Sequence, residues 1–182
     1  MNCWKSVNVH EEYGVQRIII ISIIISLLTF ILLFTSFSLL FSGVDISSSY
    51  FWLLCLSIIA MFSLHKMCHA LPILFTKRKF RLKWYFAFIV PICEIKTKKS
   101  FSKIESYAIF TMPLILITSL LLLATFMFPT HFHYFAMLIA LNVGLSVPDV
   151  LFLSHIKSAP KACQIEELEE GYDILVNNNE IK

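Results

Sequence analysis

Two histidines inside an apolar stretch are the residues of this chain best placed to do chemistry. They are His65 and His69, in the sequence His65-Lys66-Met67-Cys68-His69. Residues four apart on a helix lie on one face, one turn from each other, and H-E-x-x-H motifs hold a metal ion at this spacing. Lys66 stands at the glutamate position of that motif. The pattern therefore predicts two metal ligands without the carboxylate that normally accompanies them.

Long uncharged segments must position this pair. Hydrophobic residues make up 58% of the chain, more than the roughly 45–50% of soluble domains. Four segments reach the about 20 residues that a membrane helix requires, and we predict an all-α membrane protein, a four-transmembrane-helix bundle embedded in the lipid bilayer. The bundle would form one domain, residues 1–156, followed by a cytoplasmic polar tail, residues 157–182. The predicted spans are residues 17–41, 50–75, 106–128 and 133–155.

Positive charges predict the orientation of this bundle. Lys and Arg are concentrated between the second and third spans, whereas the two short loops on the other side contain neither. Since positive residues favour the cytoplasmic side, we expect a multi-pass protein of the cell membrane with both termini cytoplasmic. Within the basic loop, the aromatic and β-branched residues of segment 84–93 favour a short cytoplasmic β hairpin or an interfacial element. Residues 172–176 could add a short strand, and no nucleic-acid partner is expected.

Asp149 is the carboxylate placed most deeply within a predicted span. It lies about 16 residues into the fourth span and His65 about 15 residues into the second, and both spans enter from the outer side. At ~1.5 Å per residue, both side chains lie roughly 22–24 Å below that surface. Two neutral imidazoles and one carboxylate at one depth predict a three-ligand zinc site with an open fourth position. Cys68 could be an extra ligand, although a small buried thiol is the commoner role of such a cysteine.

The sequence around Asp149 predicts an irregular helix. Pro148 has no N–H to donate to the carbonyl of Gly144, so the helix should bend there. Pro113 should free the carbonyl of Ile109 in the third span in the same way. Irregular backbone at membrane depth is tolerated where it is buried in protein or lines a wet cavity. The residues expected to shape the site are Asn142, Gly144, Ser146 and Pro148.

The order and spacing of these motifs resemble a bacterial family of small membrane proteins of unknown function, classed as zincin peptidases and akin in layout to site-2 proteases. Its members carry H-E-x-x-H, then a basic and partly β segment, a helix with an internal proline and a late N-x-G-x-S-x-G-D motif. The resemblance covers about residues 50–176 and implies that His65 and His69 are metal ligands, with Asp149 as the third. Two departures are Lys66 in place of glutamate and Pro148 in place of glycine.

Lys66 separates two functional interpretations. In a zincin the glutamate accepts a proton from the metal-bound water, which a charged lysine cannot do. The favoured hypothesis is a catalytically impaired relative, a pseudoprotease, that binds a transmembrane or extended peptide at the strand edge of segment 84–93. In its metal-free form, protonated Lys66 would pair with Asp149 and replace the zinc.

The alternative is an active zinc-dependent intramembrane or juxtamembrane peptidase. Its base would be a buried lysine that has lost its proton, or a carboxylate of Glu94 or Glu105 from the cytoplasmic loop. A small carrier ranks below both interpretations, because no continuous polar stripe crosses the spans.

Overall fold

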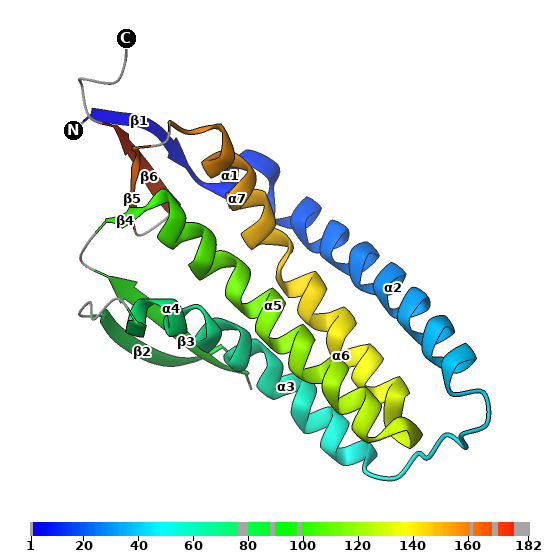
Figure 1. Cartoon of the computed structure of the whole chain (residues 1–182). Coiled ribbons are helices and arrows are strands. Elements are labelled where there is room, and N and C mark those ends of the chain that lie inside the picture. The colour runs from blue at the N-terminus through cyan, green and yellow to red at the C-terminus, as the bar shows by residue number, and fades with distance from the viewer. Residues whose placement is uncertain are drawn as a thin grey trace.

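Long helices packed side by side make up most of the structure, a computed structural model (Figure 1). It describes residues 2–75, 80–87, 90–97, 100–160, 162–168 and 171–176. In this part of the chain three helices are long and apolar enough to cross a membrane, or four if one bent pair forms a single span, which indicates membrane association. The helices are α1 (Val9–Tyr13), α2 (Val15–Leu40), α3 (Phe51–Cys68), α4 (Ala70–Phe75), α5 (Lys103–Met127), η1 (Pro129–His131), α6 (Phe132–Leu145) and α7 (Val147–Ser158).

The predicted spans correspond to these helices, with their ends shifted by a few residues. The second span consists of α3 and α4, which follow one another through a turn at His69. The fourth consists of α6 and α7, which meet at Ser146 with a bend of 40°. Pro148 lies in the first turn of α7, where its missing N–H leaves no helical bond unmade. The predicted bend is therefore confirmed, while the passage of all four spans through a bilayer stays a prediction.

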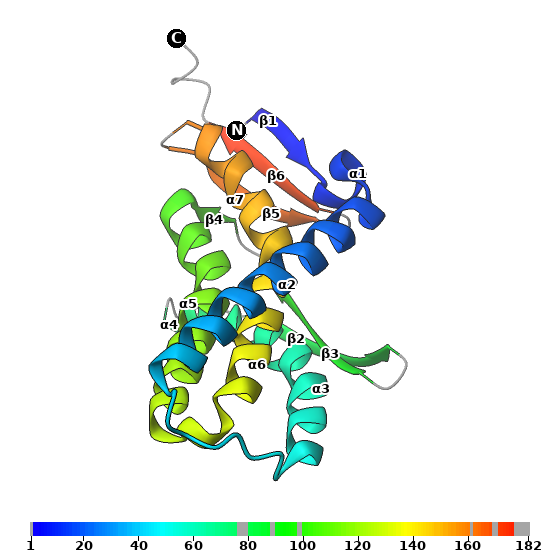
Figure 2. The same cartoon turned by 90° about the vertical axis from the view of Figure 1, so that its right-hand side faces the viewer.

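Helix α2 crosses α6 at close range, as Figure 2 shows. Gly144 permits the crossing, because a Cβ at this position would lie 2.9 Å from the carbonyl oxygen of Ser22 and closer still to the Ser26 hydroxyl. Ser26 Oγ donates a hydrogen bond to the Ala140 carbonyl at 2.9 Å. Small residues and hydroxyl groups of this kind join helices in membranes, because lipid is as apolar as the helix surfaces and apolar contact alone does little to favour helix association. The crossing holds the bent helix pair against α2.

A four-stranded antiparallel sheet joins the first and last strands of the described residues, in the order β1–β6–β5–β4. Its strands are β1 (Asn2–Val7), β4 (Phe101–Ser102), β5 (Gln164–Leu168) and β6 (Gly171–Val176). Val7, Ile165 and Ile174 are fully buried and pack against Phe152 and Ile156 of α7. The sheet therefore lies against the helix that carries Asp149.

This sheet corrects the expectation of an all-α fold. The strand predicted at residues 172–176 is confirmed as β6, but its pairing with the N-terminal strand was not predicted. Each of these strands has few apolar residues, and they form a buried face only once strands distant in the sequence have paired. The domain boundary at residue 157 stays a prediction.

A separate hairpin follows α4 and confirms the predicted β element. Strands β2 (Phe80–Ala87) and β3 (Val90–Thr97) are antiparallel, with Trp84 opposite Cys93. Strand β3 runs beside α3 (Figure 1). The alternative of an interfacial segment concerns the position of the hairpin relative to a membrane, and this stays a prediction. The basic residues at 77–79 and 98–99 lie outside the described residues.

Candidate metal centre

The end of α3 and the first turn of α7 bring His65, His69 and Asp149 together. His65 Nε2 lies 3.1 Å from Asp149 Oδ2, and His69 Nε2 lies 3.5 Å from the same oxygen. One ligand atom from each residue lies within 4.8 Å of the other two. The three residues are buried, with 4%, 8% and 8% of their surfaces exposed. The two helices thus meet at these three residues, while their depth in a membrane stays a prediction.

Asn142 of α6 determines which nitrogen of His65 carries the hydrogen. Its Nδ2 donates to the carbonyl of Pro113 at 3.3 Å and to the hydroxyl of Thr118 at 3.2 Å. Because a carbonyl can only accept, this end of the amide is the NH₂ group, and Oδ1 is an acceptor. His65 Nδ1 lies 3.0 Å from that Oδ1 and must donate to it. The Nε2 of a neutral His65 is therefore a free acceptor that faces Asp149.

Pro113 supplies the corresponding acceptor for His69. The proline lies inside α5 and has no N–H for the carbonyl of Ile109, four residues earlier. His69 Nδ1 lies 2.9 Å from that carbonyl oxygen and donates to it. The carbonyl predicted to be free thus orients a histidine. The Nε2 of a neutral His69 is an acceptor that also faces Asp149.

With both histidines neutral, three groups with lone pairs converge, whereas a proton on either Nε2 would make its contact with Asp149 a hydrogen-bonded ion pair. Two imidazole Nε2 atoms and an ionised carboxylate repel one another in a buried site, and an added proton or a cation removes that repulsion. Zn²⁺ takes His nitrogen and carboxylate oxygen as ligands, and zinc-binding histidines usually donate their other ring N–H to an acceptor. The residues present therefore fit zinc, and their binding of it stays a prediction.

A comparison with known protein families agrees with this geometry. The model of a family described as "Putative zincin peptidase" matches residues 58–164. The chain belongs to that family. The matched range contains both histidines and Asp149, so the resemblance inferred from their spacing is confirmed. Neither a curated protein nor a solved structure matches the chain.

Lys66, the departure from the zincin motif, lies outside the cluster of ligands. Its side chain is exposed, whereas Asp149 is buried and makes its ion pairs, in the described part of the chain, with His65 and His69. This arrangement contradicts the alternative of a Lys66–Asp149 pair. One position along a helix is a rotation of about 100°, so Lys66 projects to a different side of α3 from His65.

Two of the residues predicted to shape the site stabilise the break between α6 and α7. Ser146 Oγ donates to the carbonyl of Asn142 at 2.9 Å, and Pro148 begins the new helix. Gly144 admits α2 rather than contacting the ligands. Cys68 packs in an apolar cluster with Leu54 and Met61, the environment of a small buried thiol.

The proposed substitute carboxylates do not join the site. Glu105 accepts from the backbone N–H of Ser102 at 2.8 Å in a capping box at the start of α5, so it has a structural role. The Glu94 side chain lies outside the described residues. Sequence reasoning missed Thr118, which shares the Asn142 amide with Pro113. In the sequence, Thr118 could have been noticed as a hydroxyl residue in the same predicted span as Pro113.

Proposed function

We propose that this chain is a membrane zincin that binds zinc, has lost efficient peptidase activity and captures a transmembrane or extended peptide. The observation that carries the proposal is a complete, oriented set of ligands on a helix whose base position holds an exposed lysine. The ligand set supports metal binding, and Lys66 supports catalytic impairment.

The chain has the residues that would hold a metal ion, but it lacks the group that accepts a proton in a zincin. His65, His69 and Asp149 would hold the ion, while Asn142 keeps one imidazole turned toward it. Zinc, when bound, lowers the pKa of a bound water and polarises a carbonyl. A peptidase also needs a group that accepts a proton from that water and returns it to the leaving amine. The ammonium of Lys66 has three donors and no acceptor, so it cannot do this.

The β2–β3 hairpin supports the proposed capture of a peptide. In a hairpin of two strands, each strand keeps one edge with unpaired backbone groups, which can accept a further strand. Strand β3 lies beside α3, the helix that carries His65 and ends at His69. A segment added to this sheet would therefore lie on the side of α3 that the hairpin covers.

The pairing of the first and last strands supports four membrane spans. Because β1 pairs with β6, the first and last strands of the described residues lie at the same end of the bundle (Figure 1). An even number of crossings is needed for this, and the bent pair α6 and α7 would then count as one span. The concentration of Lys and Arg in the loop on that side favours a cytoplasmic location for both termini.

Zinc analysis and a gain-of-function variant test the proposal. The purified full-length chain should carry about one zinc per molecule, retained in Lys66→Glu and lost in His65→Ala. His133→Ala, at the other end of α6, is the matched histidine control and should keep the metal. Against membrane-embedded test peptides, wild type should cleave no faster than His65→Ala, while Lys66→Glu should gain activity. Zinc-free wild-type protein, reconstituted with excess zinc and still empty, would overturn the proposal.

The second candidate is an active zinc peptidase, which the intact ligand set favours. It predicts cleavage by wild type that His69→Ala abolishes. It also predicts that capture of the peptide depends on the ligands. The pseudoprotease instead predicts equal capture by wild type and His65→Ala.

A further inference from the structure

The ring of His69 is held by two consecutive residues of α5. His69 is the residue after the last turn of α3, where that helix gives way to α4. Its Nδ1 donates to the carbonyl of Ile109, and its ring lies against the ring of Phe110, with centroids 5.7 Å apart and planes at 62°. Ile109 and Phe110 thus supply the hydrogen-bond acceptor and the packing partner of one ligand.

Phe110 belongs to a group of three rings, here called the aromatic cluster, with Phe152 of α7 and Tyr172 of β6. The Phe110 centroid lies 4.6 Å from that of Phe152 and 5.5 Å from that of Tyr172. The rings of Phe152 and Tyr172 are 4.3 Å apart. Aromatic pairs in tilted or edge-to-face contact stabilise a structure beyond the apolar area that they bury. Each ring of the aromatic cluster is therefore restrained by the other two.

The aromatic cluster connects the four-stranded sheet to two of the three ligands. Phe110 contacts His69 directly. Phe152 lies three residues after Asp149 in α7, on the same side of the helix and about one turn away. Tyr172 is contributed by β6, which pairs with β1 and β5 at the end of the bundle (Figure 1). The sheet thus reaches the metal centre through aromatic rings.

We propose that Phe110 is a positioning residue of the metal centre, and that Tyr172 supports the centre by holding Phe110. This inference rests on the proposed binding of zinc. His69 must present Nε2 to the ion, and rotation of the imidazole about its Cβ–Cγ bond would move this atom away from Asp149 Oδ2, which lies 3.5 Å from it. A flat ring packed at an angle against the imidazole opposes that rotation, whereas an aliphatic side chain does not define the plane.

Substitution of the rings by leucine tests the proposal in the full-length chain, with Zn²⁺ and Co²⁺ as probes. Phe110→Leu should bind zinc about three- to tenfold more weakly in competition with a chelator, the equivalent of one aromatic contact. The visible spectrum of bound Co²⁺ reports the geometry of its ligands and should also change. Phe110→Tyr and Tyr172→Phe keep the rings and should behave as wild type. Tyr172→Leu should weaken binding in wild type but add less in the Phe110→Leu variant.

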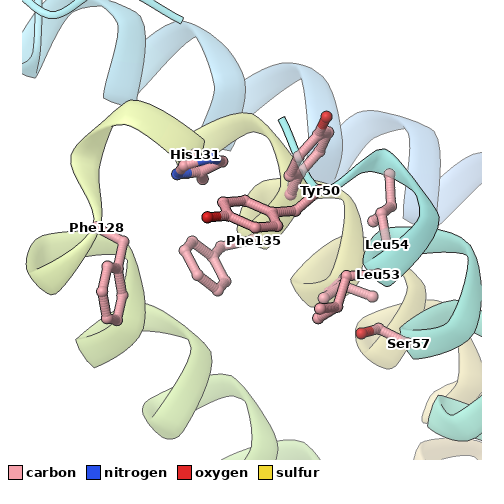
Figure 3. Close-up of a pocket in the computed structure, with 9 residues that line it drawn as sticks. Tyr50, Leu53, Leu54, Ser57, Phe128, His131 and Phe135 are labelled. Carbon is pink, nitrogen blue, oxygen red and sulfur yellow. The ribbon is translucent and has the colours of Figure 1, made fainter. Parts of the chain in front are cut away.

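Two matched variants separate positioning from a general loss of packing. Phe37→Leu makes the same substitution at a buried ring that contacts Phe132, the first residue of α6. Tyr50→Leu removes a ring 5.8 Å from that of His131, a histidine outside the metal centre. Figure 3 shows Tyr50 and His131 beside a cavity to which both contribute. Both variants should keep the zinc affinity and the Co²⁺ spectrum of wild type, whatever their effect on unfolding by denaturant.

The outcomes distinguish this inference from the function on which it rests. Wild-type protein that binds neither metal would overturn both. If wild type binds zinc, unchanged affinity and spectrum in folded Phe110→Leu would overturn the inference alone, and so would equal losses in the two matched variants. Should circular dichroism show that Phe110→Leu is unfolded, Tyr172→Leu decides in its place by the same two measurements. Strict additivity of the two leucine variants would overturn the role of Tyr172.

Discussion

Replacement of Asn142 by leucine should weaken zinc binding, although this side chain is not a ligand. Asn142 Oδ1 accepts from His65 Nδ1 at 3.0 Å, and leucine of similar size removes that acceptor. Loss of such a supporting group typically costs 10- to 100-fold in metal affinity, or about 1.4–2.7 kcal/mol. The His65 N–H is also left unpaired in a buried site, at about 1–3 kcal/mol of stability.

Two further variants separate affinity from stability. Asn142→Asp keeps an acceptor for His65 but loses the donor to Pro113, so it should keep zinc affinity and lose stability. Thr118→Val removes one of the two acceptors of Asn142 Nδ2 and should change zinc affinity by less than about threefold. The assay is competition with a chelator of known zinc affinity, with unfolding followed by circular dichroism. Folded Asn142→Leu protein with wild-type zinc affinity would refute the assignment of hydrogens at His65.

The other predictions concern stability and reactivity. Gly144→Ala should destabilise the bundle by about 1–3 kcal/mol in denaturant titrations. Adding Ser26→Ala should relieve part of this loss, because Ser26 is the side chain nearest the new methyl group. If the free-energy changes of the two variants simply add, the predicted contact between residues 26 and 144 is contradicted. Ile174→Ala should cost about 2–5 kcal/mol, whereas Ile104→Ala at an exposed position should cost little in the same titration. Chelation of zinc should lower the thermal midpoint, since a ligand at 100 times its Kd stabilises by about 2.7 kcal/mol, and Asp149→Asn should show no such shift. Burial raises the pKa of the Cys163 thiol, so alkylation by iodoacetamide should be slow at pH 8, accelerate as the pH rises and become rapid on unfolding.

The sequence predicts the positions of the ligands because helix geometry is regular. A constant rise per residue was enough to place His65 and Asp149 at one depth. In the structure His65 Nε2 lies 3.1 Å from Asp149 Oδ2. The effect of each proline on the helix was equally local, so the break beside Pro148, which begins a new helix, and the freed carbonyl of Ile109 were also predictable. The hairpin followed from its residue types.

Interactions between distant segments escaped prediction. The pairing of Lys5 with Ile174 joins residues at the two ends of the chain, and neither strand is apolar enough to indicate a partner. The exposure of Lys66 depends on how α3 is rotated in the bundle, which its nearly uniform apolar sequence does not specify. The freed carbonyl of Ile109 was expected, but its acceptance of a hydrogen bond from His69 depends on the packing of two helices.

The proline within α5 is connected to the metal centre by hydrogen bonds. A break in a buried helix leaves carbonyls without partners, which is costly in an apolar bundle. Here His69 donates to the carbonyl of Ile109, which Pro113 leaves without its helical partner. The bond that satisfies this carbonyl therefore also orients a ligand. The Asn142 amide, which donates to the carbonyl of Pro113, orients His65 in turn.

None of these bonds involves residue 66, whose side chain is exposed on another side of α3. Replacement of the glutamate by lysine therefore removes a proton acceptor without disturbing the groups that orient the two imidazoles. This independence is the physical reason why a chain with this architecture can keep a metal centre while losing its base.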